Sequence, residues 1–354
     1  MFVSGLENDQ EVASLLTLRS AEKVFILVAE VDFTTAEELF NKLQERISVW
    51  TSQQWDMALA LWQKLLPLEQ VSSNHLPIQF RVTTKIRGKT KLVEKTEFSH
   101  RTAETLEHRF KALSPSSTGE VLPHLVADIE DWKAEFYINM RKGHLWMGLA
   151  LSKTALWKNR AYQGPALSMG KTSLKPSICY GMLTLLDQHE GVILEPMTGS
   201  GMIVLEMLDL GTFRGTCICG DNADVAVLKT TQNVTSVASM QRNKLCEVDV
   251  MKWDASHLPL RDNSVEGIIT DLPFGKRIAN EGSVTYNYPR LLEEFFRVLK
   301  KKGRVVLLTS HNQLLNRIIN KDRRWINQSQ VRINHGGIEC VIFVLAKRYI
   351  PSGP

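Results

Sequence analysis

The stretch Val192-Ile193-Leu194-Glu195-Pro196-Met197-Thr198-Gly199-Ser200-Gly201, with the apolar run 202–208 after it, decides the fold of this chain. A strand, a glycine-rich turn and a helix in this order form the ligand-binding opening of a doubly wound α/β sheet. Gly199 and Gly201 let the backbone approach a ligand closely, and the helix start offers free N–H groups. The turn lacks the third glycine of dinucleotide-binding enzymes and the Gly-Lys-Ser/Thr of phosphate-loop ATPases. It therefore predicts a C-terminal α/β domain whose turn would suit an amino-acid carboxylate.

Acidic residues end the strands that follow this turn. The apolar run 216–220 leads to Asp221, about twenty residues after the glycines, where a carboxylate is placed to accept both hydroxyls of a ribose. A third strand, 246–250, leads to Asp254, which could accept from an adenine amino group, while capping a helix is an equal alternative for this side chain. The order of these acids predicts an adenosine-containing ligand.

The motif Asp271-Leu272-Pro273-Phe274 closes a fourth apolar strand. The Asp271 carboxylate and the Leu272 carbonyl are two acceptors that can hold an exocyclic NH2, while Pro273 stiffens the turn and removes a competing donor. Phe274 offers a flat face for a planar base, an interaction worth about 1–3 kcal/mol. Taken alone, the motif also fits an ordinary turn with Phe274 packed in the core. After the glycine turn and the two acids, it predicts chemistry on an amine.

The first half of the chain reads as short strands and helices of an α+β module. Two strand-like runs, 134–140 and 145–150, flank a hairpin turn, and the strand 77–85 alternates apolar and polar residues. This strand and the turn after it carry a row of cations without an intervening acid: Arg81, Lys85, Arg87, Lys89 and Lys91. Such a row can contact the phosphates of a nucleic acid, and a solvated sheet edge is the alternative that composition leaves open.

Composition divides the 354 residues into four segments. We predict an N-terminal α+β (ferredoxin-like) segment over 1–75, the cationic module over 76–152, a basic linker over 153–176 and the α/β domain over 177–354. The linker contains Arg160, and its basic character would help to steer a nucleic acid, although ordinary interdomain linkers are also polar.

Composition also excludes several classes of protein. The net charge of +5, from 43 Lys and Arg against 38 Asp and Glu, is compatible with a polyanionic partner. The sequence has no apolar run of about eighteen residues and no basic, apolar leader, so we expect neither a membrane span nor secretion and predict a cytoplasmic location. Five scattered cysteines without Cys-x-x-Cys spacing predict buried reduced thiols and no metal site.

Four motifs together resemble the THUMP-domain tRNA guanine-N2-methyltransferases: the turn 195–201, Gly220-Asp221-Asn222, Leu258-Pro259-Leu260 and the stretch 270–277. Residues 80–83 and 160–183 are similar to the family's THUMP strand and linker. The resemblance implies a Rossmann-like class I methyltransferase domain after an α+β THUMP-type RNA-binding module. Two departures are Thr198, where family members usually have Cys or Leu, and an N-terminal region shorter than the family's, so that 1–75 is expected to be incomplete.

The resemblance implies methyl transfer from S-adenosyl-L-methionine to the exocyclic N2 of guanosine in the tRNA acceptor stem, near positions six and seven. It implies a heterodimer with a small zinc-binding activator subunit. The implied cofactor-binding residues are Glu195, Pro196, Thr198, Gly199, Gly201, Asp221, Asn222 and Asp254. The implied catalytic residues are Asp271, Leu272, Pro273 and Phe274, and the expected RNA contacts are Arg81, Lys85, Arg87, Lys89, Arg160, Lys276 and Arg277. A non-catalytic RNA-binding subunit, or an enzyme acting on protein glutamine or DNA adenine, is the alternative.

Overall fold

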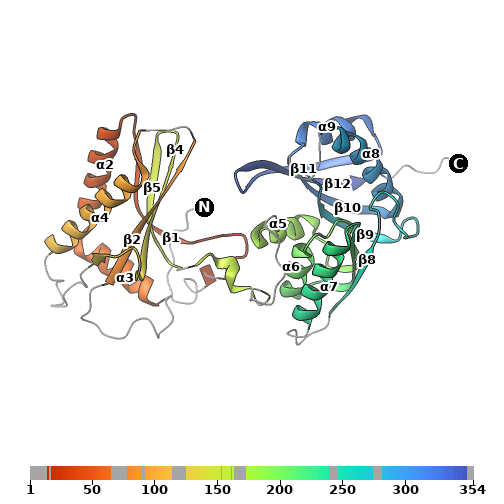
Figure 1. Cartoon of the computed structure of the whole chain (residues 1–354), viewed down its shortest axis with the longest axis horizontal. Helices are drawn as coiled ribbons and strands as arrows, with labels where there is room; N and C mark the ends of the chain where they lie inside the picture. Colours follow the sequence, from red (N-terminus) through yellow and green to blue (C-terminus); the bar gives the residue numbers. More distant parts are fainter. Residues whose placement is uncertain are drawn as a thin grey trace. The chain divides into compact units, whose positions relative to one another are not determined.

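The computed structural model describes residues 14–15, 17–64, 78–88, 92–113, 125–152, 154–160, 162, 173–238, 245–273 and 281–348. The chain divides into two compact units, Met1–Lys158 and Asn159–Pro354 (Figure 1). The division falls inside the predicted basic linker. None of the helices that the structure describes has the length and apolar character needed to cross a membrane.

Unit 1 is built on a five-stranded sheet with the order β1-β5-β4-β2-β3. Its strands are β1 (Phe25–Asp32), β2 (Ile78–Arg87), β3 (Leu125–Ala127), β4 (Ala134–Arg141) and β5 (His144–Ala150). Its helices are α2 (Ala36–Ser48), α3 (Ser52–Lys64) and α4 (Lys95–Ala112), and the short 3-10 helix η2 (Leu156–Asn159) closes the unit. The hairpin predicted between 140 and 145 is confirmed, because β4 pairs with β5 in antiparallel register across it.

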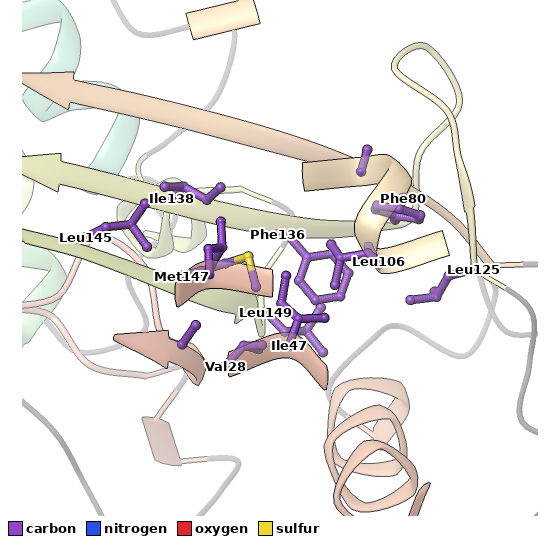
Figure 2. Close-up of a cluster of buried hydrophobic side chains, with 14 of the residues drawn as sticks. Val28, Ile47, Phe80, Leu106, Leu125, Phe136, Ile138, Leu145, Met147 and Leu149 are labelled. Carbon is purple, nitrogen blue, oxygen red and sulfur yellow. The ribbon is translucent and has the colours of Figure 1, made fainter. Parts of the chain in front are cut away.

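The strand β1 joins the predicted segment 1–75 to the predicted module 76–152. It pairs with β5 in antiparallel register, and the two segments share one apolar core. Figure 1 shows α2 and α4 along one face of the sheet, and Figure 2 shows Phe80, Phe136, Ile138 and Met147 among the side chains buried under that face. The sequence divides this unit in two because the pairing of β1 with β5 is a long-range contact that no local pattern encodes.

Unit 2 is a seven-stranded sheet with the order β11-β12-β10-β9-β6-β7-β8. Its strands are β6 (Glu190–Glu195), β7 (Arg214–Asp221), β8 (Cys246–Lys252), β9 (Val265–Asp271), β10 (Leu299–Thr309), β11 (Trp325–His335) and β12 (Ile338–Lys347). Its helices are α5 (Pro176–Leu186), α6 (Met202–Leu210), α7 (Asp224–Ala238), α8 (Glu281–Val298) and α9 (Asn312–Lys321). One apolar cluster packs α5, α6 and α7 on one face and a second packs α8 and α9 on the other. The predicted doubly wound domain is confirmed.

The last strand of the chain does not lie at the edge of the sheet. β12 lies between β10 and β11 and pairs with both in antiparallel register. The edge strand β11 escapes prediction because only its first residue, Trp325, is buried, so it lacks the apolar alternation of a strand with a covered face.

The sheet of unit 2 has its topological switch point at β6. The chain runs from β6 to β7 and β8 on one side, then returns to β9 and β10 on the other, with all five strands parallel. The connections therefore diverge at the carboxyl ends of β6 and β9, which is where open α/β sheets bind ligands. The glycine turn follows β6, and Asp271 ends β9.

The structure contradicts the predicted RNA contact of Arg160. This side chain is buried, and its Nε donates to both carboxylate oxygens of Glu206 on α6 at 3.1 and 3.2 Å. Tyr162 donates its hydroxyl to the same carboxylate at 2.7 Å. A charge inside an apolar helix needs a counter-charge, so Arg160 serves the core of unit 2 and not its surface.

Replacing Arg160 with alanine should lower the free energy of unfolding by about 3–5 kcal/mol, because it leaves the Glu206 charge buried without its partner. Urea unfolding of the full chain measures this change. Arg214, exposed at the start of β7, is the matched control, and its alanine variant should stay within about 0.5 kcal/mol of the parent. Equal stability of the two variants would contradict the structural role.

Candidate active site

The glycine turn is held in a left-handed backbone conformation. Gly199 and Gly201 have φ angles of +57° and +80°, which favour glycine, and Gly201 caps the start of α6. The Thr198 N–H donates to the Gly220 carbonyl at 2.9 Å, so the turn is tied to the neighbouring strand β7. A Cβ atom built on Gly199 would meet no other atom of the described residues within 4 Å. The space in front of the turn is therefore open.

Helix α7 braces this turn from behind. The Thr230 hydroxyl donates to the Gly199 carbonyl at 3.1 Å, and the Asn233 amide donates to the Ser200 carbonyl at 2.9 Å. Both side chains are buried. The carbonyls of the turn are thus satisfied from the α7 side, which leaves the start of α6 available to a ligand.

Asp221 ends β7 beside the glycine turn. One carboxylate oxygen accepts from the Gly199 N–H and the other from the Ala223 N–H, each at 3.0 Å. Each oxygen has a second lone pair, so both can still accept from a ligand hydroxyl. The next residue, Asn222, is exposed. The structure therefore brings Asp221 to the turn, as the sequence predicts.

Asp254 lies two residues beyond β8, at the same edge of the sheet. Its carboxylate accepts from the backbone N–H and the hydroxyl of Ser256, both at 2.8 Å, and these bonds lower its pKa. Asp254 therefore stabilises a tight turn. It does not cap a helix, which was the alternative considered from the sequence. Its neighbour Trp253 donates the indole N–H to the Pro196 carbonyl at 2.9 Å, which places this turn beside the glycine turn.

Three carboxyl groups meet at the ends of adjacent strands: Glu195 on β6, Asp221 on β7 and Asp271 on β9. Glu195 is buried and accepts from the Thr198 hydroxyl at 3.2 Å. Desolvation raises its pKa, and the charges of Asp271 and Asp221 add to the effect. Desolvation, with a contribution from the charge of Asp221, raises the pKa of Asp271 to about 6. The charges of Asp221 and Asp271 act on each other, and two carboxylates at one edge of the sheet suit a cationic ligand.

The corner after β9 is fixed by its neighbour β10. The Leu272 N–H donates to the Leu308 carbonyl at 2.8 Å, and the Leu272 side chain is buried. Asp271 and Pro273 lie on either side of Leu272, which this hydrogen bond holds in place. Phe274 lies outside the described residues, as do Lys89, Lys276 and Arg277.

A chain of hydrogen bonds that the sequence does not predict supports this corner. The Pro273 carbonyl can only accept, so the buried Tyr288 hydroxyl donates to it at 3.2 Å. The Thr309 hydroxyl must then donate to Tyr288 Oη, at 2.8 Å, and accept from the His311 N–H at 2.9 Å. Burial raises the pKa of Tyr288 to about 12, so its proton stays in place. The network ties the corner to the end of β10 and the start of α9.

Replacing Tyr288 with phenylalanine should lower kcat by about ten- to a hundredfold, because the corner loses the hydroxyl that orients the Pro273 carbonyl. Cofactor affinity should stay unchanged, since Tyr288 makes no contact with the glycine turn in the described bonds. Steady-state kinetics and calorimetric titration measure the two effects. Thr309→Ser should keep the network and the rate, and Tyr180→Phe on α5 is the matched control. An unchanged kcat in Tyr288→Phe would refute the positioning role.

Two of the cations on β2 that are predicted to contact RNA are free to bind a phosphate. Lys85 and Arg87 are exposed and form no ion pair among the described residues. Arg81 is engaged: its Nη2 lies 2.7 Å from the Glu135 carboxylate, and its guanidinium lies 3.7 Å from the centre of the Trp132 ring. Glu135 is buried, so Arg81 first serves as its counter-charge.

The five cysteines are free thiols, of which four are buried and Cys246 is half-buried. Burial raises the pKa of Cys179 and Cys246, which keeps them protonated. Within the described ranges, no group of three or more His, Cys, Asp and Glu side chains is arranged to hold a metal ion.

Known methyltransferases are similar to this chain in sequence. Residues 166–341 match the family described as "RMKL-like, methyltransferase domain". The chain is 32% identical over 233 residues to human "tRNA (guanine(6)-N(2))-methyltransferase THUMP3", which covers 62% of this chain and 44% of that protein. It is 25% identical over 368 residues to mouse "U6 snRNA (guanine-N(2))-methyltransferase THUMPD2". This alignment covers 85% of this chain and 67% of that protein. These relatives confirm the predicted resemblance, and the chain spans less than half the length of the human relative.

Solved structures share the fold over nearly the whole chain. TrmN from Thermus thermophilus superposes with a TM-score of 0.65 at 21% identity, covering 98% of this chain and 88% of that one. SMU.472, a putative methyltransferase complexed with SAH, gives a TM-score of 0.58 at 16% identity, with coverages of 96% and 88%. The predicted α/β fold with a C-terminal Rossmann-like domain is thereby confirmed.

Proposed function

We propose that this chain transfers a methyl group from S-adenosyl-L-methionine to the exocyclic N2 of a guanosine in RNA. The observation that carries the proposal is the position of Asp271, at the switch point of the sheet and in the electrostatic field of the acids beside the glycine turn. The names of the relatives support guanine N2 as the acceptor.

The residues around the turn fit such a cofactor, which supplies the electrophilic methyl group. The open space at Gly199 and the N–H groups at the start of α6 suit its amino-acid carboxylate. Asp221 and Asn222 would hold the ribose, and Asp254 with the backbone of Pro196 would border the adenine. The negative charges of Asp221 and Asp271 would favour its positive charges.

The corner Asp271–Phe274 would orient the amine. The lone pair of guanine N2 is delocalised into the ring, so orientation has to supply much of the rate. Asp271 and the Leu272 carbonyl accept the two amine hydrogens, and Phe274 stacks on the purine. With its pKa raised to about 6, Asp271 is a better proton acceptor than an ordinary carboxylate and can take the proton that leaves after transfer.

The rate should depend on the ionisation of Asp271. The carboxylate form accepts the amine hydrogens, so the pH profile of kcat/KM should be flat above about 7 and fall about tenfold per pH unit below about 6. Rates measured from about pH 5 to pH 8 with saturating cofactor check this expectation. A profile that falls only below about pH 4, the range of an ordinary carboxyl, would contradict the assignment.

The next question is which RNA carries the guanosine that is methylated. The resemblance favours a guanosine of the tRNA acceptor stem near positions six and seven, whereas the second relative is named for U6 snRNA. Mass analysis of nucleosides from tRNA and from U6 snRNA, each incubated with the chain and labelled cofactor, decides between them. Cofactor binding without any methylated RNA would favour a non-catalytic RNA-binding subunit, and methylation of protein glutamine or DNA adenine would replace the RNA assignment.

A small zinc-binding activator subunit is the proposed partner of unit 2. The edge strand β8 has one unpaired side, and next to it Val225 and Leu228 on α7 are 64% and 59% exposed. An unpaired edge beside exposed apolar side chains is a suitable protein interface. The nucleoside assay should therefore include samples with and without the activator. We further propose unit 1 as the THUMP-type RNA-binding part and retain the prediction of a cytoplasmic location.

A further inference from the structure

The hairpin formed by β11 and β12 extends beyond the edge of the sheet at which the candidate active site lies. In register, Asp271 lies beside Leu308 of β10, and Leu308 lies beside Ile342 of β12. Ile342 therefore marks the level of Asp271 within the hairpin. β12 begins four residues further out, at Ile338, so the hairpin extends about 14 Å past the level of Asp271. Figure 1 shows this hairpin projecting past the end of the sheet.

The tip of the hairpin is a tight and fully paired turn. β11 and β12 stay in antiparallel register up to His335 and Ile338. The two residues between them, Gly336 and Gly337, have φ angles of +61° and +95°, which is typical of a type I′ turn. The side-chain oxygen of Asn334 accepts from the Gly337 N–H at 3.0 Å and closes the turn. The tip is therefore a stiff projection.

Asp271 and the tip residue Ile338 face the same side of the sheet. Ile269, two residues before Asp271 on β9, is buried in the apolar cluster that packs α5, so Asp271 also faces the α5 side. On β12, Cys340 and Ile342 belong to the same cluster, and Ile338 continues their row. Burial raises the pKa of Cys340, and the charge of Asp271 adds to this effect, in agreement with a shared side.

The α5 side of the projecting hairpin is apolar and accessible. Ile338 is 45% exposed and Val331 is 39% exposed, and Ile333, whose level lies between theirs, is half-buried. The opposite side of the hairpin contains one exposed cation and one exposed acid, Arg332 and Glu339, so charge does not select a ligand here. An apolar tip beyond the active-site edge suits contact with the flat faces of bases.

A guanosine in an RNA stem has to leave its base pair before the corner at Asp271 can hold it. In a pair with cytidine, one of the two hydrogens on N2 is already bonded, whereas Asp271 and the Leu272 carbonyl together need both. Extruding the base leaves an unfavourable gap in the stack. Proteins that open stacked bases insert an apolar side chain between them. The minor groove, where N2 lies, is wide and shallow in RNA and admits such a projection.

We propose that Ile338, at the tip of the β11–β12 hairpin, inserts into an RNA stem in place of the target guanosine while Asp271 holds the extruded base. Ile338 lies about 14 Å further out than Asp271 and two strands, about 10 Å, to one side, so the tip reaches the stem while the corner holds the base outside it. We call Ile338 the wedge residue. The inference rests on the proposed function, because it takes guanine N2 as the acceptor, and it adds the device that opens the stem.

The first test compares two tRNAs that differ only in the nucleotide opposite the guanosine at position six of the acceptor stem. In one tRNA the guanosine pairs with cytidine, and in the other it faces adenosine, which makes extrusion easier. Ile338→Ala should lower kcat/KM for the paired tRNA by about tenfold, because the shortened side chain no longer fills the gap. The loss for the mismatched tRNA should stay below about twofold. Ile338→Leu should keep the parent rate on both tRNAs.

Ile326 provides the matched control. It is 40% exposed and lies near the start of β11, at the opposite end of the same hairpin. Ile326→Ala should methylate both tRNAs like the parent, and thermal unfolding of each variant shows that the fold is kept. A parent-like rate of Ile338→Ala on the paired tRNA, or an equal loss on both tRNAs, overturns the wedge.

A second measurement does not depend on methyl transfer. 2-Aminopurine in place of the guanosine at position six becomes more fluorescent when it leaves the stack. The parent chain with S-adenosyl-L-homocysteine should raise this fluorescence, and Ile338→Ala should raise it much less at saturating protein. If this difference is found but neither tRNA is methylated, the wedge stands and the methyltransferase proposal fails. If both tRNAs are methylated but the parent and Ile338→Ala give the same fluorescence, the enzyme stands and the wedge fails.

Discussion

Asp271→Asn should reduce methyl transfer to RNA at least about a hundredfold while leaving the fold intact. The asparagine keeps the size of the side chain but replaces one acceptor oxygen by a donor, so the amine meets an N–H where it needs an acceptor. Cofactor affinity should fall much less than the rate, because Asp271 lies on β9, across β6 from the ribose position on β7. Single-turnover transfer of a labelled methyl group measures the rate.

The same substitution should raise the stability of the chain. The pKa of Asp271 in the folded state is about 6, above its ordinary 3.8, so the folded state binds this proton more tightly than the unfolded chain. Stability is therefore lost as pH rises from about 4 to about 6, and at neutral pH the ionised group costs up to about 3 kcal/mol. Asparagine does not ionise and removes this cost. Urea unfolding at pH 7 should show Asp271→Asn to be more stable than the parent.

Asp249, exposed on β8, provides the matched control for both effects. Its asparagine variant should keep the parent rate and the parent stability. Near-parent methylation by Asp271→Asn would remove Asp271 from the active site. A loss of rate together with a loss of stability would instead point to a structural role.

Asp221→Ala should weaken cofactor binding by about ten- to a hundredfold, the cost of losing hydrogen bonds from two ribose hydroxyls to a charged acceptor. The carboxylate also accepts from the Gly199 N–H, so its loss loosens the glycine turn and adds to the effect. Isothermal titration with S-adenosyl-L-methionine measures the affinity.

Asp224 is the control for this second substitution, since it lies three residues further on, in the first turn of α7, and pairs with Lys252 at the surface. Asp224→Ala should bind the cofactor like the parent. If Asp221→Ala also binds like the parent, the ribose assignment is wrong even if Asp271 proves to be catalytic.

The parts of the site that the sequence predicts correctly are those encoded by local patterns. The glycine turn, Asp221 after the second strand and Asp271 after the fourth each follow an apolar run with a distinctive end, and the structure brings them to one edge of the sheet. A parallel sheet aligns its strand ends, so order along the chain is enough to bring them together.

The residues that the sequence misses act through contacts between distant segments. Tyr288 and Thr309 lie on α8 and β10, and nothing in their local pattern shows that their hydroxyls bond each other or that Tyr288 reaches the Pro273 carbonyl. The prediction for Arg160 is wrong for the same reason. A cation in a basic, loop-like stretch is typical of a protein surface, and only the ion pair with Glu206 on α6 explains why Arg160 is buried. Side-chain partners far apart in sequence are invisible to periodicity.

The pairing of Arg160 and Tyr162 with Glu206 also decides where unit 2 can be separated from the rest of the chain. A fragment beginning at the first residue of the predicted methyltransferase domain, Ser177, would leave the Glu206 carboxylate in an apolar helix without its arginine. An autonomous fragment of unit 2 therefore has to begin before Arg160, because Arg160 and Tyr162 are integral parts of the domain that follows them.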